Sequence, residues 1–279
     1  MRYKIVVDSC CELPEKWKKD PRFEIVPLAL EVGDYRIMDD ETFDQAEFIR
    51  KVAECPTCPR SSCPSPQRYM ESYRTEAEHV YVVTLSSNLS GSYNSAVVGR
   101  DLYHENYGSK QIHVVDSRSA SCGETQIAMK AMEYEEQGFP FEVIVEKLER
   151  FRDSMRTYFV LDNLETLRKN GRLSGVKALV ASTLNIKPVM AGTREGTIEQ
   201  LGQGIGIKKA LQKMAETLVK NVSNAQERVL MITHCNNAAR AEALKNHILS
   251  RISVGNVVVM DTAGVSSMYA NDGGVIVTI

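Results

Sequence analysis

Short apolar runs, separated by polar or turn-forming residues, recur along the whole chain. They are rich in Val and Ile, which is the pattern of strands buried in a parallel sheet. The sequence predicts strands at residues 4–8, 80–85, 112–116, 157–161, 228–233, 257–260 and 275–279.

Amphipathic segments lie between several of these strands. Apolar residues recur at helical spacing in 141–153 and again in 211–218. Strands that alternate with helices predict an α/β fold, with a mostly parallel sheet in the first half. The chain of 279 residues has room for two domains that share a cleft. Because one helix ends just before the strand at 157–161, we predict α/β domains at residues 1–157 and 158–279.

Small hydroxyl-bearing residues follow three of the N-terminal strands. They occur after Asp8, within Ser86–Ser95 and after Asp116. Open α/β sheets bind ligands beyond the carboxyl ends of their strands, where helix N-termini offer unpaired N–H groups. Helix capping alone would explain any single Ser or Asp. The density of hydroxyls in Ser86–Ser95 exceeds what one cap needs, and it predicts a site for an anion or carboxylate.

Charge and hydropathy argue against several classes of protein. The 34 Lys and Arg are balanced by 36 Asp and Glu, whereas a nucleic-acid-binding surface is basic. No apolar run approaches the ~18 residues of a membrane-spanning helix, and the first residues lead into a strand rather than a secretory signal. Seven irregularly spaced cysteines fit a reduced chain. We therefore expect a cytoplasmic protein that binds no nucleic acid.

Motifs for metal, redox or nucleotide chemistry are weak. Cys55 and Cys58 form a C-x-x-C in a proline-rich segment, without the second ligand pair of a zinc site. We interpret them as structural or incidental. Gly202–Gly206 lacks the preceding parallel strand of a dinucleotide site, and we interpret it as a flexible loop. We expect no metal ion and no cofactor.

Two further segments have constrained backbones. Ser61 and Ser62 precede two prolines that restrict the chain, so their hydroxyls are pre-oriented for a ligand oxygen, while Ser65 is placed to cap a helix. Asn170–Gly171 predicts the end of a short helix. Arg172, just beyond this turn, is placed either to brace a loop or to contact a partner.

Six segments, in order along the chain, resemble the DegV family, which includes the fatty-acid-binding subunits of bacterial fatty acid kinase. Ser61–Ser65 is similar to the family's T-S-x-P-S loop, with Ser in place of the more usual Thr. The segments are Val6–Pro14, Ser61–Ser65, Ser86–Ala96, Val115–Ser121, Leu161–Ser174 and Leu184–Pro188.

The resemblance implies a lipid carrier rather than an enzyme. A long-chain fatty acid would lie in a tunnel at or near the junction of two α/β domains. Its carboxylate would be held by Ser61, Ser62 and Ser90, with Gly91 and Ser92 adjacent. The carrier would take the acid from a membrane surface and present it to a partner kinase, which makes the acyl phosphate. Hydroxyl donors would satisfy the buried carboxylate without enclosing it in arginine.

Two departures from the family pattern stand out. Family members commonly place a His near the ligand head, whereas Tyr269 is the nearest counterpart by position here. A phenol donates a hydrogen bond but does not titrate near neutral pH. The family's basic run is also depleted at residues 203–209, so the sequence supports lipid binding more directly than kinase partnership. Arg172, beyond the Asn170–Gly171 turn, is the candidate for partner contact.

Two alternatives remain open at this stage. One is a stand-alone hydrolase or phosphotransfer enzyme that acts on a small acidic substrate in the same cleft, with Asp8, Asp116 or His234 as acid or base. The sequence shows no matching nucleophile–base pair for it. The other is a carrier for a different acidic lipid or small carboxylate that serves a different partner.

Overall fold

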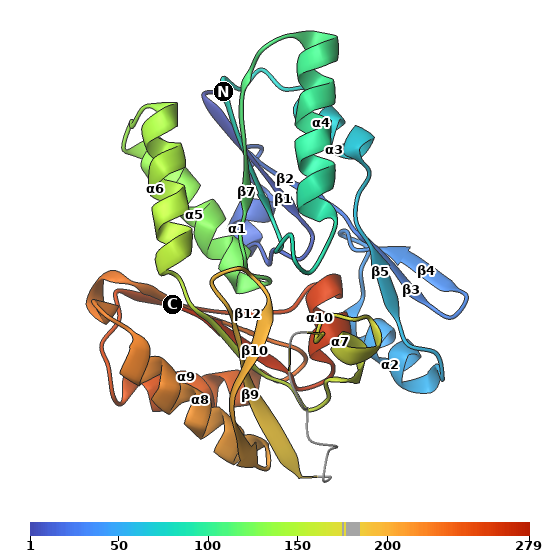
Figure 1. The fold of residues 1–279 in the computed structure, drawn as a ribbon, viewed down its shortest axis with the longest axis vertical. Coiled ribbons are helices and arrows are strands. Elements are labelled where there is room, and N and C mark those ends of the chain that lie inside the picture. The colour runs from blue at the N-terminus through green and yellow to red at the C-terminus, as the bar shows by residue number, and fades with distance from the viewer. Residues whose placement is uncertain (175, 177–184) are drawn as a thin grey trace.

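The computed structural model describes residues 1–174, 176 and 185–279, where strands and helices alternate along the chain (Figure 1). The strands are β1 (Tyr3–Asp8), β2 (Phe23–Val26), β3 (Ala29–Val32), β4 (Tyr35–Met38), β5 (Arg60–Ser62), β6 (His79–Thr84), β7 (Gln111–Asp116), β8 (Thr157–Val160), β9 (Ile186–Gly192), β10 (Ile198–Ile205), β11 (Val229–His234), β12 (Asn256–Asp261) and β13 (Val275–Thr278). The helices are α1 (Glu15–Lys18), α2 (Gln45–Glu54), α3 (Pro66–Ser72), α4 (Ser92–Tyr107), α5 (Cys122–Glu136), α6 (Phe141–Ser154), α7 (Glu165–Lys169), α8 (Ile207–Asn221), α9 (Ala238–Leu249) and α10 (Gly264–Ala270).

The first sheet is parallel throughout, in the order β2-β1-β6-β7. Successive residues of β1 face opposite sides. Val6 packs with Tyr69 and Tyr73 beneath α3 and α4, whereas Ile5 and Val7 pack against the α5 and α6 side. Figure 1 shows these helix pairs on the two faces of the sheet. The predicted mostly parallel sheet is confirmed.

A small antiparallel sheet, β4-β3-β5, projects from this layer (Figure 1). Its strand β5 carries Ser61 and Ser62, paired with Leu30 and Ala29 of β3. The small sheet therefore fixes the backbone of both predicted ligand-binding serines.

The third sheet is mixed, in the order β10-β9-β8-β13-β11-β12, and only β11 and β12 pair in parallel among its described strands. Helices α8 and α9 cover one face through a core that includes Met214, Leu218 and Leu244. Helix α5 packs against the other face and also against β1 and β6 of the first sheet. It is the layer between the two large sheets.

All seven predicted strands are present, with ends displaced by at most one residue. The helix predicted at 141–153 is α6. It ends at Ser154 and β8 begins at Thr157, while the division into domains 1–157 and 158–279 stays a prediction. Leu184 of the predicted motif lies outside the described residues. Within the described part of the chain, every helix is too short or too polar to cross a membrane.

The interpretation of Gly202–Gly206 as a flexible loop is wrong. Residues up to Ile205 belong to β10, which pairs with β9. A Cβ on Gly204 would lie 2.6 Å from the Cα of Ala210, so the glycine permits close packing of α8 on the strand. Gly206, with φ +75°, makes the turn into α8. The glycines therefore serve helix–strand packing and a tight turn.

Candidate functional site

A buried carboxylate organises the turn that precedes α4. Asp8 ends β1, and its Oδ2 accepts hydrogen bonds from the N–H of Leu85 (3.0 Å) and from Ser92 Oγ (2.6 Å). Its Oδ1 accepts from the N–H of Cys10 at 3.1 Å. Burial raises the pKa of Asp8, although these bonds oppose the shift. The hydroxyl of Ser92 also lies 2.6 Å from Tyr69 Oη, so Ser92 belongs to the framework and does not line the pocket described next.

Most of the other predicted ligand-binding residues surround one pocket of about 220 Å³, which we call the head pocket. It lies between β5, the turn before α4 and the side of α10. Ser61 Oγ and Tyr269 Oη face each other there at 3.3 Å. The predicted residues that line it are Ser61, Ser62, Ser90, Gly91, Tyr269 and Arg172.

Two features hold the loops of the head pocket in place. Ser65 Oγ accepts from the N–H of Arg68 at 3.2 Å, so the predicted cap of α3 is confirmed. A Cβ on Gly91 would lie 3.1 Å from Cys63 Sγ, so the glycine allows the two loops to approach. The serines thus come from two rigid and adjoining segments.

Tyr269 reaches the head pocket from α10. Burial raises the pKa of this phenol, while its bond with Ser61 and the charge of Arg172 act in the opposite direction. The raised pKa keeps the phenol protonated at neutral pH, so that it is available as a hydrogen-bond donor. The departure from the family His therefore preserves a donor at this position.

Two buried carboxylates anchor the start of α10. Asp39 accepts from the N–H groups of Gly264 (2.7 Å) and Val265 (2.8 Å), and Glu12 accepts from that of Ala263 (3.3 Å). Burial raises the pKa of Asp39 to about 6 and that of Glu12 to about 7, although the hydrogen bonds oppose both shifts. These bonds connect α10 to segments near the N-terminus and so fix Tyr269 relative to the serines.

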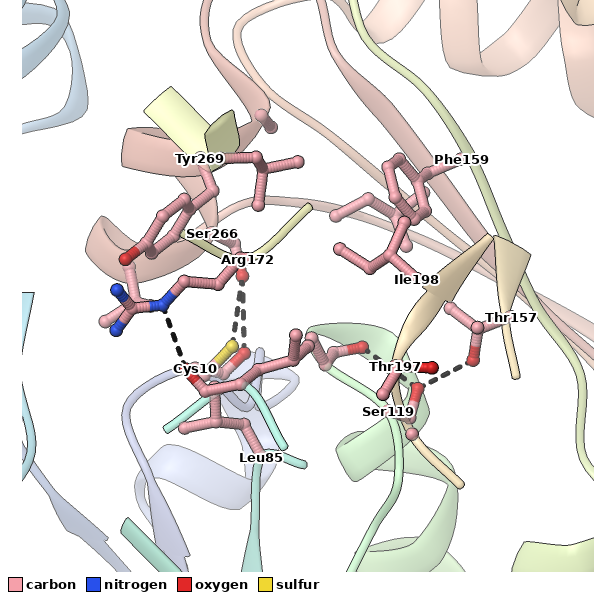
Figure 2. A pocket seen from close by; sticks show the side chains of 18 of the residues that line it. Cys10, Leu85, Ser119, Thr157, Phe159, Arg172, Thr197, Ile198, Ser266 and Tyr269 are labelled. Atoms are coloured by element: carbon pink, nitrogen blue, oxygen red, sulfur yellow. Dashed lines mark hydrogen bonds between the residues drawn. The ribbon is translucent and has the colours of Figure 1, made fainter. Parts of the chain in front are cut away.

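Arg172 lines the head pocket as well, which sequence reasoning did not anticipate. Its Nε donates to the carbonyl of Leu89 at 3.1 Å, and Nη1 donates to that of Asn170. It therefore braces the turn after α7 against the loop before α4. The guanidinium stands beside Tyr269, so the pocket offers a charged donor in addition to the expected hydroxyls (Figure 2).

A narrow apolar space of about 100 Å³ continues from the head pocket, and we call it the tunnel. The two share Leu85, Leu89, Arg172, Val265 and Tyr269. Figure 2 shows Arg172 and Tyr269 on one side, and Phe159 and Ile198 on the other. Further apolar lining comes from Leu161, Leu167, Ala270 and Ile276. The tunnel therefore has walls from both halves of the chain.

Polar side chains border the far part of the tunnel. Ser119 Oγ and Thr157 Oγ1 lie 2.7 Å apart, so each satisfies the other at the edge of an apolar space (Figure 2). The arrangement as a whole is one polar pocket that leads into an apolar tunnel. Such a site can hold an amphipathic molecule with a single polar end.

The candidate acid–base residues of the enzyme alternative lie outside the head pocket. Asp116 accepts from the N–H (3.0 Å) and Oγ (2.5 Å) of Ser87, which holds the turn after β6. His234 Nδ1 accepts from the N–H of Asn237 and lies 3.3 Å from Asp261. Asp8 is fully buried within its turn. Each of the three has a structural role.

The C-x-x-C cysteines also have local partners. Cys55 Sγ lies 3.0 Å from Thr57 Oγ1, and Cys58 Sγ accepts from Asn170 Nδ2 at 3.4 Å. Among residues 1–174, 176 and 185–279, no three His, Cys, Asp or Glu are grouped as metal ligands would be.

Comparison with known proteins finds related sequences along the whole chain. The sequence model described as "Uncharacterised protein, DegV family" matches residues 2–278. A DegV domain-containing protein of Streptococcus pneumoniae is 32% identical over 279 residues, which cover 99% of this chain and 98% of that protein.

Solved structures of related proteins also match the whole chain. A DegV family protein from Ruminococcus gnavus, refined with vaccenic acid, is 51% identical, with a TM-score of 0.97 over 100% of this chain and 99% of that one. The Streptococcus pneumoniae Fatty Acid Kinase B3 protein loaded with linoleic acid is 30% identical, with a TM-score of 0.89 over 100% of this chain and 99% of that one. The chain belongs to the DegV family.

Proposed function

We propose that the protein is a fatty-acid-binding carrier, with the carboxylate of its ligand in the head pocket and the acyl chain in the tunnel. One observation carries this proposal: the polar head pocket adjoins an apolar space between the sheets and shares five lining residues with it. The relative refined with vaccenic acid and the relative loaded with linoleic acid support it.

The energetics favour a ligand with a long chain and one charged end. Burial of about 14 methylenes at about 0.8 kcal/mol each gives roughly 11 kcal/mol of gross transfer free energy, before the costs of association. The acyl chain therefore supplies affinity. The carboxylate must find donors, because a buried unpaired charge is costly. Ser61, Tyr269 and Arg172 offer them, with Ser62 and Ser90 beside them.

The proposal assigns no bond chemistry to this chain. A separate kinase would transfer a phosphoryl group from ATP to the carboxylate and release ADP, so the carrier would act in the cytoplasm and meet membranes only transiently. The kinase name of the Streptococcus pneumoniae relative supports such a partner. Arg172 remains the proposed contact for it, since its guanidinium stands at the head pocket, where the carboxylate would be presented. Ser92 would contribute by holding the turn through Asp8.

Native mass spectrometry tests the proposal. The purified protein should carry one fatty acid, or take up one equivalent of added vaccenic acid. The alcohol of the same chain length is the matched control, and it should bind more weakly because it lacks the charge that the head pocket satisfies. A protein that is empty and takes up no acid would refute the carrier. Turnover of a small acidic substrate by the isolated chain would favour the enzyme instead.

A further inference from the structure

A second cleft, lined by four arginines, lies beside the tunnel. Its volume is about 650 Å³, and it is bounded by the end of α6, the loop after β7 and strands β8 to β10. We call it the arginine cleft. Its charged lining residues are Arg118, Arg152, Arg156, Arg194, Asp153 and Glu199.

The carboxylates of the cleft leave part of this positive charge unbalanced. Asp153 Oδ1 accepts from both Arg118 (3.2 Å) and Arg152 (2.8 Å), and Arg152 is also paired with Glu149. Arg156 donates to the carbonyls of Asp153 (3.0 Å) and Met155 (2.8 Å) instead of to a carboxylate. Arg194 is exposed and, among the described residues, forms no ion pair. Four positive charges thus meet three negative ones, those of Asp153, Glu199 and Glu149, and Arg156 and Arg194 are the two arginines without a carboxylate partner among the described residues.

The guanidinium groups determine which ligand class fits. Arginine presents planar pairs of N–H donors that match phosphate oxygens, and two guanidiniums without carboxylate partners can each form such a pair. The cleft is also within the size range of small-molecule sites. The oxygens of a phosphate would supply the anionic acceptors that Arg156 and Arg194 lack.

The arginine cleft is distinct from the head pocket. It shares Arg118, Thr157 and Gly192 with the tunnel, whereas the head pocket shares none of these residues. In Figure 2, Thr157 and Ser119 lie on the opposite side of the tunnel from Arg172 and Tyr269. An anion in the arginine cleft would therefore be a second ligand, separated from a fatty-acid carboxylate by the tunnel.

We propose that the arginine cleft binds a phosphate group, carried either by a free phosphorylated compound or by a lipid headgroup. The proposal rests on the four guanidiniums and the cleft, and it stands whether or not the head pocket binds fatty acid.

The first test is titration calorimetry with inorganic pyrophosphate. The double variant Arg156→Gln/Arg194→Gln should bind pyrophosphate at least about tenfold more weakly than the parent, since two charge-assisted donors are lost. Arg150→Gln is the matched control: Arg150 lies on α6, is exposed and pairs with Glu146 outside the cleft. It should leave the affinity unchanged. Succinate should bind the parent much more weakly than pyrophosphate.

The second test identifies the source of the phosphate. Vesicles of phosphatidylglycerol should retain the parent protein, and the double variant should be released, if the ligand is a headgroup. Vesicles of phosphatidylcholine should retain neither. Pyrophosphate binding without vesicle binding would assign the cleft to a free phosphorylated compound.

Several outcomes would overturn the proposal. The parent protein would bind neither pyrophosphate nor phosphatidylglycerol, or the double variant and Arg150→Gln would lose pyrophosphate affinity equally. Succinate that binds the parent as tightly as pyrophosphate does would also contradict it. Circular dichroism on the same preparations shows whether a variant that fails to bind pyrophosphate is folded. Uptake of vaccenic acid tests the carrier proposal separately.

Discussion

Tyr269 shows how one side chain can join two halves of a site. It belongs to α10, near the C-terminal end of the chain, yet its hydroxyl lies 3.3 Å from Ser61 on β5. Arg172 lies beside the same hydroxyl and helps to keep its pKa from rising further. A ligand oxygen at this point would meet donors from three distant segments.

Replacement of Tyr269 by Phe tests this role. Phe keeps the ring and removes the donor, so fatty-acid affinity should fall by about 1–3 kcal/mol, the cost of one bond to a charged group. Displacement of a fluorescent fatty acid measures the change. Tyr107→Phe, at an exposed position on α4, is the control and should bind as the parent does. Equal affinities in all three proteins would remove Tyr269 from the site.

Glu12 gives the stability a pH dependence of defined sign. Burial raises its folded-state pKa from 4.5 to about 7, so the folded protein holds this proton more tightly than the unfolded chain. The stability so contributed is complete below about pH 4.5 and is lost as the pH rises through about 7. Two to three pKa units correspond to about 3 kcal/mol.

The variant Glu12→Gln cannot titrate at this position. Its free energy of unfolding, relative to the parent, should therefore increase by up to about 3 kcal/mol between about pH 5 and pH 8. Urea denaturation at several pH values measures this difference. Glu41→Gln, at an exposed position, should show no such trend. A constant difference for Glu12→Gln would contradict the raised pKa.

At the scale of elements, the hairpin of β9 and β10 connects the site to α8. Its strands line the tunnel through Ile198 and Gly192, while Gly204 lies against the first turn of α8. The packing of this hairpin therefore affects both the stability of the C-terminal sheet and the shape of the tunnel.

Gly204→Ala should destabilise the protein. The new Cβ would lie 2.6 Å from the Cα of Ala210, a backbone atom that moves only with the helix. We expect a loss of about 1–3 kcal/mol, typical of overpacking. Gly192→Ala, on the partner strand, is the control: its nearest neighbour, Thr157 Cβ, would be 3.6 Å away, which is ordinary contact. Thermal unfolding of both variants measures the contrast, and similar melting temperatures would refute the packing argument.

The strands that could be predicted are those with uninterrupted β-branched runs. β1 and β6 are largely buried on both faces, so their sequences are nearly continuous apolar runs that need no tertiary information. β9 contains Pro188 and β10 contains Gly202 and Gly204, which normally argue against a strand. Their pairing depends on contacts with each other and with α8, which a local pattern does not contain.

A local sequence pattern is also insufficient to place every residue of the binding site. The clustered hydroxyls and the Pro-flanked loop identified Ser61 and Ser90 as candidates, because both are local features. The direction of the Ser92 hydroxyl depends on Asp8, 84 positions earlier, and the place of Arg172 depends on Leu89. Side-chain direction is set by such distant partners, so spacing alone could not separate the pocket residues from their supports.

At the scale of the whole molecule, α5 joins the two large sheets. Gln126 donates to the carbonyl of Val229 (3.1 Å) and to Thr278 Oγ1 (2.9 Å) of the C-terminal sheet. On its other side, Ile127 is fully buried in a core shared with Ile5 and Val7 of β1. The proposed domains 1–157 and 158–279 therefore share one helix as part of their cores.

We expect this sharing to couple the unfolding of the two halves. Calorimetry should show one unfolding transition. Ile127→Ala should lower the temperature of this whole transition, because the cavity left in the core costs about 2–5 kcal/mol of unfolding free energy. Lys130→Ala, at a half-buried position that pairs with Glu133, is a milder control on the same helix. Two separate transitions, of which Ile127→Ala shifts only one, would show that the halves unfold independently.

The position of β13 has a consequence for synthesis on the ribosome. This strand is the last of its sheet along the chain, yet it lies between β8 and β11 and pairs with both. While translation proceeds, the parallel N-terminal sheet can form early, but the second sheet lacks its centre until β13 emerges. Until then the backbone edges of β8 and β11 lack the strand that pairs with both of them. The nascent chain is therefore exposed to aggregation and to chaperones throughout the synthesis of the segment between β8 and β13, and the second sheet is complete only once β13 has emerged.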